Sequence, residues 1–174
     1  MTYQPVCYKY TSTKEYHEDF PVAYRQWRAD AKPGDVPGCS VIHGYAFSMK
    51  FYFGTNNLDA RNWVADYGSL GALKSFLQSQ FDHTLLVAAD DPEIDWYKEA
   101  EARGIAKVIV LPKLGCESLA DIIYRYVNGV FIPENWGTGE SERLWCYRVE
   151  VRETCKNMAF REGHREWNED LFDN

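Results

Sequence analysis

The chain lacks any long uninterrupted run of apolar residues and any run of like charge. A membrane-spanning helix needs about 20 consecutive apolar residues, so no membrane span is predicted, and the first residues show no signal-peptide pattern. The net charge of −7 argues against a partner with a phosphate backbone, because such binding requires clustered Lys and Arg. We therefore expect a cytoplasmic protein that binds neither a membrane nor nucleic acid.

Paired cysteines at metal or redox spacing are also absent. The five cysteines are irregularly spaced, and no two have the C-x-x-C spacing of a zinc ribbon or redox motif. This arrangement disfavours a disulfide framework and predicts a reducing compartment. Most of the cysteines are expected to be buried as small hydrophobic side chains. Cys39 is the exception, because it follows a loop at 31–38 that contains two Pro and two Gly.

Apolar and aromatic residues are plentiful. At 174 residues and 45% hydrophobic content, the chain is large enough for one core, so we predict a single domain over 1–174. Aromatic residues make up 16%. Such an excess is typical of a pocket for a flat ligand or of a subunit interface, and equally of a Tyr-rich sheet core, so both interpretations stay open.

The periodicity of the apolar residues predicts the secondary structure. Apolar and polar side chains alternate along 41–53, as in a strand with one buried face. Apolar residues spaced three and four apart predict helices that bury one face. The predicted strands are one that ends near Phe20–Trp27, then 41–53, 84–89, 107–111, 145–152 and 157–161, and the predicted helices are 68–81, 92–103 and 116–130.

The order of these elements predicts an α+β fold, with an antiparallel four-stranded sheet and helices on one face. The core is expected over about 18–163, with an insert at about 88–111 and a charged tail formed by the last dozen residues. The helix within the insert is polar on one side, which favours a surface position. Exposed edges of such a sheet are commonly paired across subunits, which favours a homo-oligomer.

Two short motifs carry thiol, imidazole and carboxylate groups. Cys39 lies four residues before His43, and a thiol becomes a nucleophile or proton-transfer group only when a base or cation stabilises its thiolate. Asp82 and His83 follow the predicted helix 68–81. An Asp can fix the tautomer of a His for proton transfer. The alternative is that the pair ends the helix, where the negative end of the helix dipole would stabilise a cationic His.

Two glutamates are candidates for ligand binding. Glu153 lies within the aromatic stretch 144–160, where a buried carboxylate is costly unless it is paired. A ring N–H beside an exocyclic amino group, as in a pterin or guanine, would satisfy both of its oxygens. The alternative is a salt bridge to an Arg. Glu117 begins a predicted helix, where the dipole favours an acidic side chain in any case.

Five pieces of the chain, in this order, resemble the 6-pyruvoyl-tetrahydropterin synthase and 6-carboxytetrahydropterin synthase family, which has the T-fold. The resemblance covers about residues 18–163, with an extra segment in the insert. The pieces are Phe20-Pro21-Val22-Ala23-Tyr24-Arg25, Cys39-Ser40-Val41-Ile42-His43-Gly44-Tyr45, Trp63-Val64-Ala65-Asp66-Tyr67, Phe81-Asp82-His83-Thr84-Leu85-Leu86, and the pair formed by Glu117-Ser118-Leu119-Ala120 with Val151-Arg152-Glu153-Thr154.

The resemblance implies a lyase that acts on 7,8-dihydroneopterin triphosphate in pterin or 7-deazaguanine biosynthesis. It assigns Cys39 as the general acid or base at the substrate side chain, with Asp82 and His83 completing the proton relay. Glu153 would anchor the pterin ring, with Glu117 as a second substrate-binding residue. The Cys-x-x-x-His spacing resembles the carboxy-forming branch, which feeds queuosine-type synthesis. The family is typically hexameric, which implies a homo-oligomer whose sheets form a barrel.

The chain departs from the family at the zinc ligands. The family holds zinc with three His that polarise the substrate hydroxyls, the Lewis-acid role of a metal. Here only His43 is present, and Tyr24 and Tyr45 stand at the other two positions. A phenol is a poor zinc ligand at neutral pH, because its pKa is about 10. A zinc cofactor is therefore in doubt: either it is absent or it is held differently, with Cys39, His83 or His17.

Two functions stay open from the sequence. In the first, the acid and base residues support a working lyase of a divergent branch. In the second, the chain is a non-catalytic pterin- or purine-binding protein that has lost the zinc chemistry and binds its ligand through Glu153.

Overall fold

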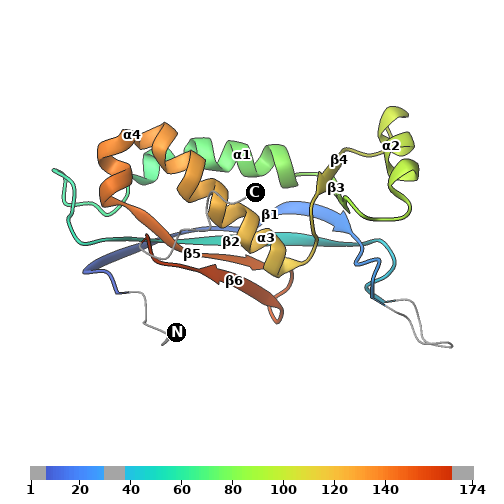
Figure 1. Ribbon diagram of the computed structural model, residues 1–174, viewed down its shortest axis with the longest axis horizontal. Helices are drawn as coiled ribbons and strands as arrows, with labels where there is room; N and C mark the ends of the chain where they lie inside the picture. The colour runs from blue at the N-terminus through green and yellow to red at the C-terminus, as the bar shows by residue number, and fades with distance from the viewer. Residues whose placement is uncertain (1–6, 30–37, 166–174) are drawn as a thin grey trace.

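The structure is a computed structural model that describes residues 7–29 and 38–165 (Figure 1). The predicted loop at 31–38 and the predicted tail lie largely outside these ranges. Figure 1 shows the insert at one end of the long axis of the molecule, and α4 (Ile132–Arg143) at the other. In the described part of the chain, no helix is both long and apolar enough to cross a membrane.

A six-stranded sheet in the order β4-β3-β1-β2-β5-β6 forms the frame of the molecule. Its four-stranded part is antiparallel, as predicted. Two further strands, one just before the insert and one within it, run parallel to β1, and the prediction of an antiparallel four-stranded sheet did not include them. The antiparallel strands are β1 (Tyr10–Tyr24), β2 (His43–Thr55), β5 (Trp145–Arg152) and β6 (Met158–Glu162), and the added ones are β3 (Thr84–Ala88) and β4 (Val108–Leu111).

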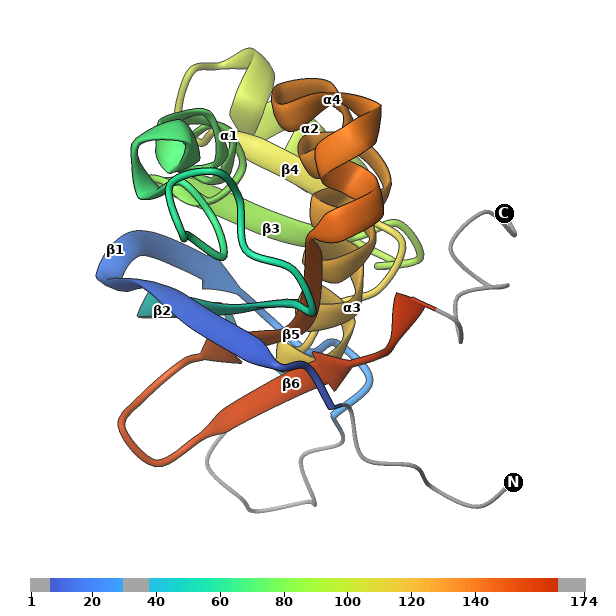
Figure 2. The ribbon, with the colours of Figure 1, turned by 90° about the vertical axis from the view of Figure 1, so that its left-hand side faces the viewer.

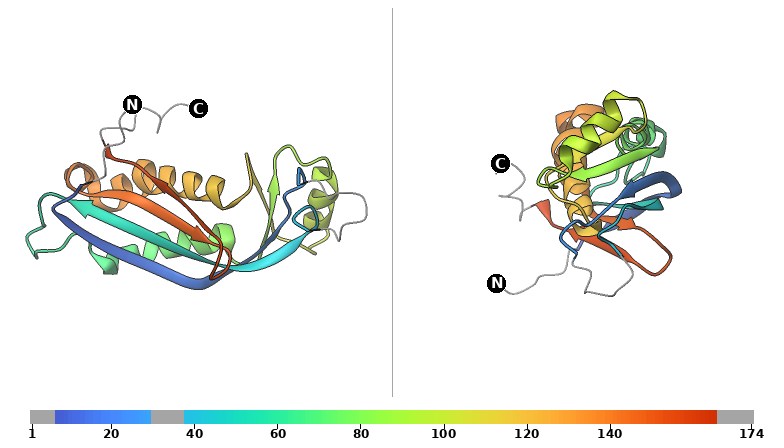
Figure 3. Two further views of the ribbon diagram at one scale, coloured as in Figure 1. Left: turned by 90° about the horizontal axis from the view of Figure 1, so that it is seen from below. Right: turned by 90° about the vertical axis from the view of Figure 1, so that its right-hand side faces the viewer.

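Helices α1 (Gly71–Phe81), α3 (Cys116–Tyr126) and α4 cover one face of the sheet (Figure 2). Figure 3 shows the strands from the side that these helices leave open. The apolar stripe of each helix meets the alternating apolar residues of the strands, and the enclosed core has no solvent exposure at its centre. Fully buried members include Phe20, Phe47, Phe51, Leu73 and Leu119.

Helix α2 (Ile94–Ala102) packs on the opposite face, against β3 and β4. Alternate residues of β3 divide between two clusters: Leu86 belongs to the main core, and Val87 packs with Tyr97 of α2. Successive strand residues point to opposite faces, so a parallel pair at the sheet edge needs cover on both sides. The prediction that all helices lie on one face therefore fails for the insert, while its predicted surface position is confirmed by the exposed side of α2.

The segment after α3 was not predicted. The helix expected over 116–130 continues through a π-helical turn at Val127–Phe131 into α4. Pro133 sits in the first turn of α4, where its missing N–H is harmless. Gly137 has φ of 76°, a left-handed conformation that interrupts the helix. Because Pro and Gly are typical of loops, the sequence did not predict this helix, which packing against the core stabilises.

Candidate active site

Three aromatic rings meet where the end of β1 pairs with the start of β2. Tyr24 is the cross-strand partner of His43, and the ring centroids are 5.2 Å apart. Tyr45 lies 5.3 Å from His43 and 6.1 Å from Tyr24 by the same measure. Buried Phe20 and Phe47 are partners in the same ladder, so these side chains project on the helix-covered face. We call Tyr24, His43 and Tyr45 the ring cluster.

The carboxylate of Glu153 lies against the ring cluster. The phenol of Tyr24 donates a hydrogen bond to Oε1 of Glu153, and the Glu153 N–H donates to the Asn157 carbonyl at 3.1 Å within the β5–β6 turn. Burial, the hydrogen bond and the charge of Glu153 raise the pKa of Tyr24 well above its ordinary value. Tyr24 is therefore a neutral phenol that donates to a carboxylate.

Cys116, the first residue of α3, is a second neighbour of Glu153. Its thiol is buried, and burial together with the charge and hydrogen bond of Glu153 raises the pKa of Cys116 to about 12. The thiol is thus a neutral donor at the same carboxylate. The sequence predicted a helix start at Cys116 and gave Glu117, but not Cys116, a role in binding. Their approach to Glu153 depends on how α3 crosses the β5–β6 turn, which no local pattern reveals.

Cys39 and Glu117 lie at the margin of this group. The Cys39 thiol is exposed, and its carbonyl accepts a hydrogen bond of 2.7 Å from the N–H of Gln26. Burial, Glu153 and then Cys39 raise the pKa of Tyr45, so the sulfur lies within electrostatic reach of the ring cluster. Glu117 is exposed in the first turn of α3, and its charge acts on Cys116. These predicted residues gather at one end of the sheet.

Asp82 and His83 form a direct pair at the junction of α1 and β3. Asp82 Oδ1 lies 2.6 Å from His83 Nδ1, and the His83 side chain is 84% exposed. Asp82 also ends α1, with its N–H donating to Gln78 O at 3.0 Å. The motif therefore ends the helix, and the Asp82 carboxylate engages Nδ1 of His83, which directs Nε2 away from Asp82.

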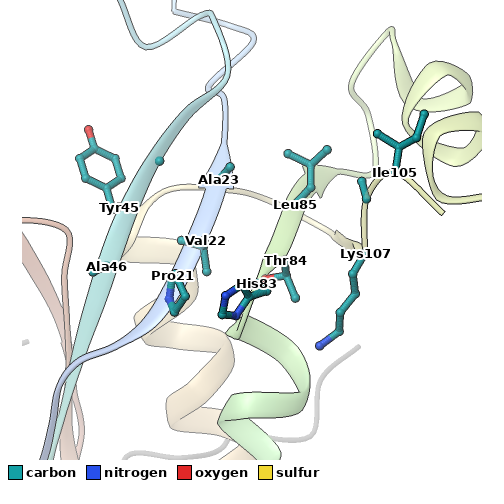
Figure 4. Close-up of a pocket in the computed structure, with 12 residues that line it drawn as sticks. Pro21, Val22, Ala23, Tyr45, Ala46, His83, Thr84, Leu85, Ile105 and Lys107 are labelled. Atoms are coloured by element: carbon teal, nitrogen blue, oxygen red, sulfur yellow. The ribbon is translucent and has the colours of Figure 1, made fainter.

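His83 lines an open groove of about 630 Å³ (Figure 4). The His83 N–H donates to the Pro21 carbonyl at 2.9 Å. Pro21 and Ala23 alternate with Val22 and Tyr24, so they project on the other side of β1. Figure 4 shows Lys107 beside Thr84 and His83, and Tyr45 at the far margin. Within one chain, His83 thus lies on a groove that Tyr45 of the ring cluster also lines, while Tyr24 projects on the other side of β1.

The residues at the three positions of the ring cluster do not match a zinc site of three histidines. Zinc in proteins takes imidazole, thiolate or carboxylate ligands, and this arrangement offers one imidazole and two phenols. His43 Nδ1 lies 2.7 Å from the Val41 carbonyl, which leaves Nε2 as its only free nitrogen. Among the residues that the structure describes, no three His, Cys, Asp or Glu side chains are grouped so as to hold a metal ion.

His17, which the sequence offered as a spare ligand, lies on the other side of Glu153. Its Nδ1 is 3.4 Å from the Ser48 hydroxyl. His17 and Glu153 both line a cavity of about 50 Å³, which has room for about one or two water molecules. A bicyclic ring does not fit in this cavity.

Comparison with known families gives one match over most of the chain. A family model described as 6-pyruvoyl tetrahydropterin synthase matches residues 13–164. A 6-carboxy-5,6,7,8-tetrahydropterin synthase from Rickettsia typhi is 32% identical over 57 residues, which are 32% of this chain and 41% of that protein. The similarity therefore spans less than half of that relative.

Solved structures share the fold at low sequence identity. An uncharacterised protein from Wolinella succinogenes superposes with a TM-score of 0.73 at 19% identity, over 89% of this chain and 98% of that one. A 6-pyruvoyl tetrahydropterin synthase from Plasmodium vivax gives 0.57 at 13%, over 90% and 99%. The Caenorhabditis elegans enzyme of that name gives 0.54 at 18%, over 91% and 100%. These likenesses confirm the predicted α+β T-fold.

Proposed function

Because this chain belongs to the 6-pyruvoyl tetrahydropterin synthase family, as its motifs predicted, we propose that it is a 6-carboxytetrahydropterin synthase-like lyase acting on 7,8-dihydroneopterin triphosphate. The observation that carries the proposal is the position of Glu153. Its carboxylate lies beside aromatic rings and within the same end of the molecule as the Cys39 thiol. This arrangement supports a role for Glu153 as the acceptor for a pterin ring and for Cys39 as the acid–base group at its side chain.

Each predicted residue has a role in this proposal. Glu153 accepts hydrogen bonds from the ring N–H and amino group of the pterin, a charge-assisted contact. Cys39 transfers a proton at the substrate side chain. Asp82 holds His83 in one tautomer, so that Nε2 is the atom that exchanges a proton. Glu117 lies beside this group and contributes to binding at its margin.

An oligomer is part of the proposal. In this proposal the relay is completed between protomers, with His83 of one protomer approaching Cys39 of another. The predicted homo-oligomer supplies this approach. We propose a hexamer on the same ground, in keeping with the family resemblance.

We also propose that the chemistry proceeds without a zinc ion held by three histidines. The support is the donor set: Tyr24 and Tyr45 present phenols, whose ordinary pKa of about 10 keeps them protonated at neutral pH. Tyr24 keeps its hydrogen bond to Glu153, the neutral Tyr45 phenol would face an oxygen atom of the substrate side chain, and Cys39 would carry the proton transfer.

One observation favours the alternative of a non-catalytic pterin- or purine-binding protein. Tyr24 and Cys116 already donate to Glu153, so a ligand ring has to share this carboxylate with them. A site whose carboxylate is shared in this way can still bind a pterin or purine ring without catalysing a reaction.

Turnover separates the two functions. The purified protein is incubated with 7,8-dihydroneopterin triphosphate, with and without added zinc, and products are resolved by chromatography. Product formation by the wild-type chain supports the lyase. Absence of product in both conditions rejects it, and a rise in melting temperature with a pterin then supports the binding protein, because a ligand that binds only the folded state stabilises it.

A further inference from the structure

The insert is joined to the segment that follows β1 by an ion pair between partly buried Arg25 and buried Asp91. Arg25 binds Asp91 through two bonds, Nε to Oδ2 at 2.9 Å and Nη2 to Oδ1 at 2.6 Å. The Asp91 side chain is 1% exposed. Its Oδ1 also accepts the Glu93 N–H at 2.9 Å, just before α2 begins. Such a two-point contact fixes the guanidinium plane as well as its distance.

Asp90, which precedes Asp91, binds the other end of the segment that follows β1. Asp90 accepts the indole N–H of Trp27 at 3.1 Å and pairs with the guanidinium of Arg28. Both charged partners are more than half exposed, so this ion pair is the weaker of the two. Two consecutive residues of the insert thus hold residues 25–28 from one side.

Gln26, between these anchors, contacts the candidate site. Its N–H donates to the Cys39 carbonyl at 2.7 Å. Its side-chain Nε2 donates to the Leu114 carbonyl at 3.2 Å, two residues before α3 starts at Cys116. The segment 25–28 therefore links the insert to the residue that bears the exposed thiol and to the helix start beside Glu153.

Stability alone is a poor explanation for the Arg25–Asp91 pair. Removing two charges from water offsets much of their attraction, so a buried ion pair contributes little net stability and serves better to select one arrangement. The insert also has an apolar cluster of its own, in which Tyr97 packs with Val87 and Val108. What the pair adds is a fixed orientation for residues 25–28, which follow β1.

We propose that the insert positions Cys39 for proton transfer, with Arg25, Asp91 and Gln26 as positioning residues. Asp91 fixes the orientation of Arg25. The neighbouring Gln26 is held with it, and its hydrogen bond to the Cys39 carbonyl fixes the position of Cys39. This inference rests on the proposed acid–base role of Cys39.

Two variants and one matched control test the inference. Asp91→Asn removes the charge but keeps an oxygen that can accept the Glu93 N–H. Arg25→Lys keeps the charge and removes the planar fork. The control, Glu99→Gln, breaks an exposed pair with Arg103 in the same insert, away from residues 25–28. Folding of each full-length variant is checked by circular dichroism, and Arg25→Lys decides the test if Asp91→Asn does not fold.

The readouts are amide exchange at Gln26, alkylation of Cys39 by iodoacetamide resolved by peptide mass spectrometry, and steady-state kinetics. Both variants are expected to raise exchange at Gln26 by about tenfold or more, because its hydrogen bond to Cys39 opens more often. The Cys39 alkylation rate is expected to rise with it. In turnover, kcat is expected to fall about tenfold with KM changed less than about threefold, the pattern of a group needed in the transition state.

The outcomes separate this inference from the proposed function. Exchange and alkylation like those of Glu99→Gln would overturn the positioning role, even if the melting temperature falls and the lyase is active. An inactive wild-type chain would reject the lyase and leave the exchange and alkylation results to decide whether the insert holds Cys39.

Discussion

The phenol of Tyr24 donates its hydrogen bond to the carboxylate of Glu153. The two residues come from β1 and from the turn after β5, which are not neighbours in the sheet because β2 lies between them. The contact brings a neutral donor to the acceptor that the proposed function assigns to a ligand ring. Tyr24 also stands at one of the positions at which the family resemblance implies a zinc ligand.

Replacing Glu153 tests its role as the ring acceptor. Glu153→Gln should weaken binding of neopterin by about 1–3 kcal/mol, the scale of a lost hydrogen bond to a charged group. Isothermal titration calorimetry measures the change, with exposed Glu99→Gln as the control. An unchanged Kd would exclude Glu153 as the anchor.

Cys39→Ala should abolish turnover and leave the Kd for neopterin within about twofold, because the thiol acts on the side chain and not on the ring. Cys155→Ala is the matched control, since Cys155 is also exposed. Activity that survives in Cys39→Ala would make Cys39 a bystander.

The ring cluster offers a test of the metal argument. The double variant Tyr24→His with Tyr45→His places three imidazoles where two phenols and His43 now meet. We expect it to bind about one zinc per chain, since three histidines are a sufficient protein ligand set. Mass spectrometry of metals in dialysed protein measures the content. A wild-type chain that retains a stoichiometric zinc through dialysis would show that the phenols do not exclude the metal.

Raising the pH should reveal the contact between Tyr24 and Glu153. The pKa of Tyr24 is raised in the folded state, so the two states bind equal numbers of protons at this group below about pH 10. Above that pH the unfolded chain loses the proton first, and stability falls as pH rises. Tyr24→Phe should therefore show a shallower loss of urea stability above pH 10. The same slope in both proteins would argue against the contact.

Asn128 should be important for stability, because it joins the π-helical turn to β5. Its amide accepts the Cys146 N–H and donates to the Cys146 carbonyl, both at 2.9 Å. Asn128→Ala leaves both backbone groups buried without this partner, which should cost about 3 kcal/mol in urea denaturation. Exposed Asn135→Ala, which loses one bond to Phe131 O, is the control. Equal losses in the two variants would contradict the account.

The sequence predicted what depends on local pattern. The alternation of residues gave strand β5 at its observed bounds, and the Cys39 and His43 motif lies where β2 begins. Helix α4 was hidden because Pro133 and Gly137 are typical of loops, yet packing against the core overrides that preference.

Long-range relationships were beyond the sequence. The approach of Cys116 to Glu153 depends on how α3 crosses the sheet. The position of His83 on its groove depends on how β3 pairs with β1, and the proposed role of Asp91 depends on where the insert folds back. Each requires tertiary packing that periodicity does not encode.

Turnover of 7,8-dihydroneopterin triphosphate by chelator-treated protein tests the central claim most directly. We predict formation of a tetrahydropterin product at a rate that does not change when zinc is restored, and its loss in Cys39→Ala. No product with or without zinc would contradict the lyase, and product that forms only with zinc would contradict the metal-free site.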